Sequence, residues 1–191
     1  VVVGGIKNVI GGTSGRSFIG GGEEISINAS TNSGIVSGKL NRIENSWASF
    51  IGGGEENLVG SGASGSAGGV VGGGRLNKII SSSPLSAIVG GSENEIVGNI
   101  TGYNFIGVTE DSEMGAATYF AIVGGASHVI TNNINYCVIA GGISHIIEDA
   151  SDYSFIGGGN TNLIQQSSYS SAIVGGSENK VVTTKSGTIL G

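Results

Sequence analysis

The chain has 191 residues, of which 38% are hydrophobic and only 12% are charged. A globular domain carries about 25% charged residues, so few faces of this protein are solvated by charge. The net charge is −6, and eight Lys and Arg residues are too few for a surface that binds nucleic acid or anionic lipid. The single cysteine, Cys137, excludes a disulfide framework and a cysteine-based zinc site. No stretch approaches the ~20 apolar residues of a helix inserted in a membrane.

The sequence repeats itself from end to end. Residues 86–96 read SAIVGGSENEI, and residues 171–181 read SAIVGGSENKV. When the copies are aligned on the asparagine, called the anchor, its successive positions are 17, 16, 16 and 20 residues apart, followed by six steps of 17. The anchor positions are Asn8, Ile25, Asn41, Asn57, Asn77, Asn94, Asp111, His128, His145, Asn162 and Asn179.

Two columns of large apolar residues flank the anchor. Six residues before it stands Ile, Val or Phe in every copy, and two residues after it stands Ile or Val in every copy except at Glu113. A period near 17 with two short β-branched segments is typical of a β-solenoid, in which each copy forms one coil and each segment one strand. The chain has 38 glycines, and so many glycines disfavour a helical repeat. Collagen is also excluded, because the glycines do not recur at every third residue and the chain has only one proline.

The predicted fold is therefore all-β, a parallel β-solenoid of about 11 coils with about 17 residues each. Residues 1–191 form a single array. Because the chain opens at Val1 inside one repeat and stops at Gly191 inside another, we expect it to be a segment of a longer fibrous protein.

Both faces of the first strand in each coil are predicted to be packed. Because side chains alternate along a strand, the positions eight, six and four residues before the anchor face the interior. On the other face, pairs such as Phe50/Gly52 and Ala87/Val89 combine one large and one small residue, which is the volume compensation of a packed surface. An exposed apolar stripe along a fibre would aggregate, so this face predicts a partner, most simply another copy of the chain.

The anchor is Asn seven times, His twice and Asp once. These residues tolerate the left-handed backbone region better than other non-glycine residues, so we predict a corner whose side chains stack from coil to coil. The predicted corner ladder comprises Asn8, Asn41, Asn57, Asn77, Asn94, Asp111, His128, His145, Asn162 and Asn179. The coil of Asp111 should be distorted, because Val108 falls in a glycine column there. The variable polar residues after each second strand, such as 28–32 and 165–168, are expected on an outward edge.

Aromatic residues also recur at the coil period. Tyr119, Tyr136 and Tyr153 lie nine residues before their anchors, and Tyr103 and Tyr169 lie within one residue of that column. The spacing predicts an aromatic ladder on the edge of five coils, which either holds the coils in register or binds a glycan or cell-surface receptor.

The two histidines occupy adjacent anchors and are expected to stack about 5 Å apart. They either fill the corner in place of asparagine or serve a metal or pH-sensing role. No column of Asp or Cys completes a set of metal ligands, so no metal site is predicted, and no residue is assigned a catalytic or cofactor-binding role.

The pattern Ser-x-Ile-x-Gly-Gly-x-x-Asn-x-Ile, with connectors rich in Ser and Gly, resembles the YadA-like head repeats of trimeric autotransporter adhesins and related repeats of phage and viral tail fibres. The resemblance covers essentially the whole chain, although the coil is longer and its glycine is doubled. It implies a left-handed β-roll that forms a homotrimer outside the cell, on a cell surface or a virion.

The sequence favours a structural or adhesive fibre segment and not an enzyme. One alternative is a polysaccharide-processing enzyme built on a β-helix, which would need Asp, Lys or Arg in a column on one face; the basic residues here are few and scattered. The other alternative is an ice-binding solenoid, which would need threonines at a fixed phase, whereas the threonines of this chain keep none.

Overall fold

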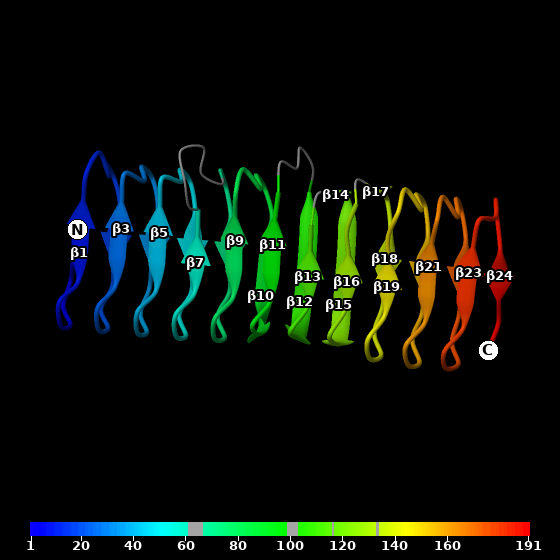
Figure 1. Ribbon diagram of the computed structural model, residues 1–191. Helices are drawn as coiled ribbons and strands as arrows, with labels where there is room; N and C mark the ends of the chain where they lie inside the picture. Colours follow the sequence, from blue (N-terminus) through cyan, green and yellow to red (C-terminus); the bar gives the residue numbers. More distant parts are fainter. Residues whose placement is uncertain (61–66, 99–102, 116, 133) are drawn as a thin grey trace.

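A computed structural model describes residues 1–60, 67–98, 103–115, 117–132 and 134–191. These residues form the predicted all-β solenoid, in which parallel strands stack from coil to coil along one axis and the two termini lie at opposite ends (Figure 1). None of them forms a helix long and apolar enough to cross a bilayer. The inserted residues of the 20-residue step fall largely within 61–66, outside the described residues.

Two sheets of 11 strands run the length of the solenoid. Sheet A contains β2 (Phe18–Ile19), β4 (Gly34–Ile35), β6 (Phe50–Ile51), β8 (Val70–Val71), β10 (Ala87–Ser92), β12 (Asn104–Glu110), β15 (Phe120–Ala126), β18 (Val138–Ile139), β20 (Phe155–Ile156), β22 (Ala172–Ile173) and β24 (Thr188–Ile189). Sheet B contains β1 (Val9–Gly11), β3 (Ser26–Asn28), β5 (Arg42–Glu44), β7 (Leu58–Val59), β9 (Lys78–Ile80), β11 (Glu95–Val97), β13 (Glu113–Met114), β16 (Val129–Ile130), β19 (Ile146–Ile147), β21 (Leu163–Gln165) and β23 (Lys180–Val182). A small third sheet pairs β14 (Ala117–Thr118) with β17 (Ile134–Asn135).

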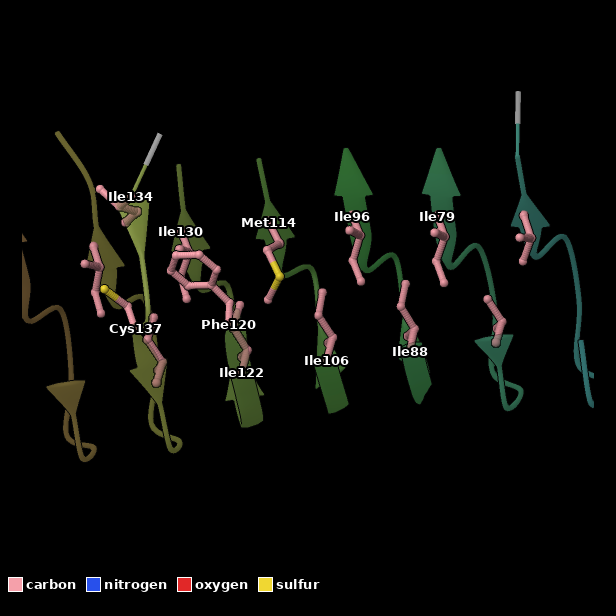
Figure 2. Packing of buried hydrophobic residues seen from close by; sticks show 14 of the residues in the cluster. Ile79, Ile88, Ile96, Ile106, Met114, Phe120, Ile122, Ile130, Ile134 and Cys137 are labelled. Carbon is pink, nitrogen blue, oxygen red and sulfur yellow. The ribbon is translucent and has the colours of Figure 1, made fainter. Parts of the chain in front are cut away.

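The core consists of the two predicted aliphatic columns, one from each sheet. Ile88 of β10 and Ile96 of β11 are fully buried, and their equivalents line up in successive coils (Figure 2). Ile96 pairs in register with Ile79 of the preceding coil. Each fully buried aliphatic side chain contributes roughly 1.5–3 kcal/mol relative to its exposed state, and every coil repeats this gain.

The structure corrects the predicted register in the coil after Asn94. Ile88 pairs with Ile106 and not with Phe105, and Ile96 pairs with Met114 and not with Glu113. The core columns therefore have no charged member there, because Met114 is buried and Glu113 is exposed.

The anchor of that coil is Ser112 and not Asp111. The backbone N–H of Ser112 donates to Oδ1 of Asn94 at 3.1 Å, and Ser112 is buried whereas Asp111 is exposed. The anchor Ser112 therefore lies 18 residues after the anchor Asn94 and 16 residues before the anchor His128. A constant 17-residue alignment conceals this shift, because the longer step and the shorter step compensate for each other.

The expected distortion occurs in this coil, where a turn becomes a strand. Val108 and Thr109 take the places of Gly90 and Gly91. Gly91 has a φ of +91°, and a Cβ on it would overlap the carbonyl oxygen of Thr109. Thr109 does not adopt this left-handed conformation. The parallel strand pairing therefore continues through the turn, and β10, β12 and β15 are longer than the other strands of sheet A, with 6, 7 and 7 residues.

Candidate functional site

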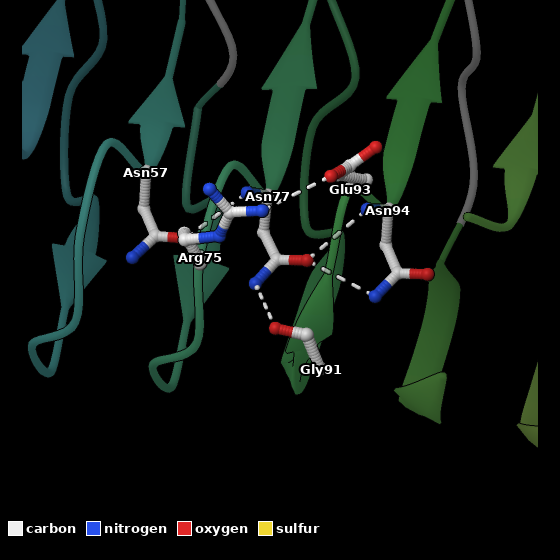
Figure 3. Close-up of polar contacts among 6 residues, drawn as sticks. All are labelled: Asn57, Arg75, Asn77, Gly91, Glu93 and Asn94. Carbon is white, nitrogen blue, oxygen red and sulfur yellow. Dashed lines mark hydrogen bonds and ion pairs between the residues drawn. The ribbon is translucent and has the colours of Figure 1, made fainter. Parts of the chain in front are cut away.

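The anchor side chains point into the solenoid and form the predicted ladder. Oδ1 of Asn57 accepts the backbone N–H of Asn77 at 3.0 Å, and Oδ1 of Asn77 accepts that of Asn94 at 3.2 Å. Nδ2 of Asn77 donates to the carbonyl oxygen of Gly91 in the next coil (Figure 3). Each rung satisfies a buried N–H that would otherwise cost about 1–3 kcal/mol.

The left-handed residue at this corner is the one that precedes the anchor, so the predicted backbone role of the anchor is wrong. Leu40, Glu56 and Glu93 have φ values of 55°, 56° and 60°. Asp111, with a φ of 50°, is the equivalent residue of its coil and does not belong to the ladder. Asparagine recurs because its short side chain carries both an acceptor and a donor. Ile25 is the one anchor that offers neither.

His128 and His145 take over the acceptor role of asparagine in the ladder. Their rings stack with centroids 5.2 Å apart and an interplanar angle of 8°. Nδ1 of His128 accepts the N–H of His145 at 3.2 Å, and Nδ1 of His145 accepts the N–H of Asn162 at 3.1 Å. Nε2 of His128 lies 3.0 Å from the carbonyl oxygen of Gly124, so its proton resides there and the ring is neutral.

Burial and the neighbouring His145 lower the pKa of His128 to about 4, and burial also lowers the pKa of His145. Both Nδ1 atoms are already hydrogen-bonded to the backbone, so neither has a lone pair available for a metal ion. Within the described ranges, no three His, Cys, Asp or Glu side chains are arranged to hold a metal. The two histidines are thus structural members of the corner.

Two serine ladders also run inside the solenoid. Eight residues before the anchor, Oγ of Ser17 accepts the N–H of Ser33 at 3.3 Å. Eleven residues before it, Oγ of Ser30 accepts the N–H of Ser46 at 3.0 Å. Sequence reasoning placed the second column on the outward edge, but Ser30, Ser46 and Ser168 are fully or almost fully buried. The sequence feature that could have revealed this buried column is the recurrence of serine at the coil period, at Ser14, Ser30, Ser46, Ser83, Ser151 and Ser168.

Apolar residues replace these serines near the middle of the array. Phe120, Ile134 and Cys137 are buried and pack beside the isoleucine columns (Figure 2). Sγ of Cys137 keeps the serine pattern, because it accepts the N–H of Ser154 at 3.3 Å and donates to the carbonyl oxygen of Ser151. Burial raises the pKa of the Cys137 thiol to about 12, which makes it unreactive.

The tyrosines form an exposed ladder at a different corner. Tyr119 and Tyr136 stack with centroids 5.0 Å apart and an angle of 7°, as do Tyr136 and Tyr153. Tyr103 joins at 6.0 Å and 39°, because the corrected register places it in the same column. Ser170 occupies this column in the next coil, and Tyr169 lies one position earlier, so the stacked ladder runs from Tyr103 to Tyr153. We call these four residues the tyrosine ladder.

The tyrosine ladder presents ring edges and hydroxyl groups to solvent, while ring faces are covered by neighbouring rings. The inner rings, Tyr119 and Tyr136, are 43% and 49% exposed, whereas the end rings, Tyr103 and Tyr153, are 62% and 60% exposed. Stacking a sugar on a ring face is therefore possible only at the ends, and the inner rungs can offer hydrogen bonds and ring edges.

The outer side of sheet A carries an exposed apolar stripe. Nine coils contribute one large side chain each, between 38% and 50% exposed: Phe18, Val36, Phe50, Val70, Val89, Phe105, Val123, Phe155 and Val174. Val174 lies nine coils beyond Phe18, and the strand spacing of about 4.8 Å gives the stripe a length of roughly 40–45 Å.

Charge is divided unevenly along the chain. Between Lys78 and Lys180 the sequence contains no Lys or Arg but nine Asp and Glu residues. This half includes the tyrosine ladder, so its surface repels sulfated, phosphorylated or carboxylated ligands. The ion pairs, such as Lys7–Glu24 at 2.6 Å and Arg75–Glu93 at 3.3 Å, lie on the surface and contribute little to stability.

Comparison with known proteins gives no family assignment: no family model matches the chain, and no curated protein matches it.

Proposed function

We propose that this chain is a structural segment of an extracellular attachment fibre, on a bacterial surface or a virion, and that its copies associate through the apolar stripe. The stripe is the observation that carries the proposal. It repeats at the coil period over almost the whole array, which is too long and regular for the scattered apolar residues of a soluble monomer.

Another copy of the chain fits the stripe better than an unrelated partner does. The partner must present apolar groups with the same spacing over the same length, and a parallel copy does so coil by coil. In the stripe, Phe50 is followed by Gly52 two residues later, whereas Val89 is preceded by Ala87, so the protruding side chain changes position from some coils to others along the axis. Copies related by rotation about a parallel axis present this same relief to one another.

The length of the array favours association. The loss of translational and rotational freedom is incurred once for each copy that joins, whereas each coil adds a similar apolar contact. The affinity between copies should therefore rise with the number of coils. The trimer and left-handed coil implied by the resemblance to adhesin heads are compatible with such a shared axis, and the homotrimer is our proposed assembly.

The attachment role is supported by the tyrosine ladder and by the charge around it. Exposed phenol hydroxyls at a regular spacing suit a hydroxyl-rich glycan or a cell-surface receptor. The absence of Lys and Arg between Lys78 and Lys180 favours an uncharged ligand over an acidic one.

Sedimentation velocity tests the assembly. The wild-type chain should sediment with the mass of three copies, whereas Val123→Asp, within the stripe, should sediment as a monomer with unchanged circular dichroism. Ile143→Asp is the matched control, because Ile143 is 55% exposed and Val123 is 50% exposed, but Ile143 lies outside the stripe. A wild-type chain that stays monomeric at all concentrations would refute the proposed association.

A further inference from the structure

The tyrosine ladder holds phenol rings in fixed proximity. Adjacent centroids are 5.0 Å apart for Tyr119–Tyr136 and Tyr136–Tyr153, and 6.0 Å apart for Tyr103–Tyr119. The backbone N–H of Tyr136 donates to the carbonyl oxygen of Thr118 at 3.1 Å, and that of Tyr153 to Asn135 at 2.9 Å. These bonds keep the left-handed corners of successive coils in register, so the rings remain neighbours.

We propose that the tyrosine ladder is a site of oxidative cross-linking, where a peroxidase-type one-electron oxidant with hydrogen peroxide joins neighbouring tyrosines as dityrosine. Each phenol gives up one electron and its hydroxyl proton and becomes a phenoxyl radical. Two radicals then form a carbon–carbon bond between ring positions ortho to oxygen, and the two ortho hydrogens move to the oxygens. The pair has lost two electrons and two protons, which convert one hydrogen peroxide into two water molecules.

The rest of the molecule directs oxidation to this ladder. All four rings are at least 43% exposed, so an oxidant reaches them. Cys137 and Met114, two side chains that compete readily for an oxidant, are fully buried, and the exposed Trp47 lies outside the ladder. Each cross-link would join one coil to the next in the segment whose corner contains the two histidines, and it would add a covalent bond to the existing hydrogen bonds. This inference is independent of the attachment role.

The test oxidises the dilute full-length chain with peroxidase and hydrogen peroxide and measures dityrosine fluorescence. Denaturing electrophoresis separates cross-links within a chain from cross-links between chains. Trypsin cannot resolve the rungs, because no Lys or Arg lies between Lys78 and Lys180. Cleavage after glutamate separates Tyr136 from Tyr153 at Glu148, so the expected product is fragment 114–148 joined to fragment 149–178 with the loss of two hydrogen atoms.

Tyr136→Phe provides the decisive comparison. It removes two of the three neighbouring pairs, so the initial rate of dityrosine formation within a chain should fall by about two thirds, and the joined fragments should disappear. Tyr169→Phe is the matched control, because Tyr169 is exposed but lies outside the ladder, and it should leave both signals unchanged. Equal yields from wild type and Tyr136→Phe, joined fragments that persist in Tyr136→Phe, or cross-links formed only between chains would each overturn the inference.

Discussion

Acidification should destabilise the coils that contain His128 and His145. An unfolded histidine has a pKa of about 6.5, whereas burial and the adjacent His145 lower the pKa of His128 to about 4. Between these two values the unfolded chain binds more protons than the folded chain, so stability is complete above about pH 6.5 and is lost as the pH falls towards 4. The structural cause is direct: a proton on Nδ1 of His128 would face the N–H group that it now accepts.

The size of this effect follows from the pKa difference. At pH 5 the unfolded pKa lies about 1.5 units above the pH, which corresponds to about 2 kcal/mol from His128 alone, and the full difference amounts to about 3 kcal/mol. His145 acts in the same direction, because its pKa is also lowered. Most carboxylates remain ionised at pH 5, so this comparison isolates the histidines better than one at pH 4.

Urea unfolding followed by circular dichroism at pH 7 and pH 5 measures the effect. The matched variant replaces both histidines with asparagine, the usual anchor, which accepts the same N–H without titrating. Its free energy of unfolding should change much less between these two pH values than that of the wild type. An equal loss of stability in both proteins would refute the assignment of acid sensitivity to the histidine rungs.

Three further predictions concern single positions. Asn77→Ala should lower stability by about 2–3 kcal/mol because it leaves the buried N–H of Asn94 without an acceptor, whereas Asn77→Ser, which retains an acceptor as Ser112 does, should cost clearly less in the same urea titration. Gly74→Ala should lower the melting temperature, because φ is +92° and a Cβ would overlap the next coil, while Gly73→Ala, where a Cβ meets nothing within 4 Å, should leave it nearly unchanged. Ile122→Asp should unfold the neighbouring coils, seen as lost circular dichroism; an unchanged spectrum and melting curve would contradict its burial.

The repeat period was sufficient to predict the solenoid, its parallel pairing and its aliphatic core. Strand residues alternate between faces and recur at a fixed spacing, so Ile88, Ile96 and their equivalents were placed correctly from spacing and residue type. The same reliance on spacing misassigned one coil. The spacing of residues in the sequence counts chain length, whereas the coils are aligned by their hydrogen bonds. A step that is one residue longer, followed by a step that is one residue shorter, returns the next anchor to the 17-residue alignment and hides the shift.

The hydrogen-bonding roles were harder to predict. The preference for asparagine suggested left-handed backbone at the anchor, but the preceding residue adopts it, even where it is Leu40 or Leu76. The hydrogen bonds of the anchor impose the left-handed conformation on the preceding residue, even when that residue type disfavours it. The residue type at one position therefore does not reveal its backbone conformation. The serines eleven residues before the anchor were placed on the outward edge because serine is also common in exposed turns, whereas the positions eight residues before the anchor were correctly placed inside.

The three inner ladders explain how a chain so rich in Gly and Ser can form a continuous core. At most inward corners the backbone N–H points along the axis, where no strand partner lies opposite, and a side chain of the previous coil accepts it; Ile25, Phe120 and Ile134 offer no such acceptor. The acceptor need only be short and correctly placed, so Asn, Ser, Cys and His all serve. Stability is therefore transmitted from coil to coil by equivalent positions, and a change at one rung should weaken its two neighbouring coils more than distant ones. Hydrogen exchange would measure how far that weakening extends: in Asn77→Ala, the exchange rate of the backbone amide of Asn94, in the adjacent coil, should rise more than that of Asn162, in a distant coil.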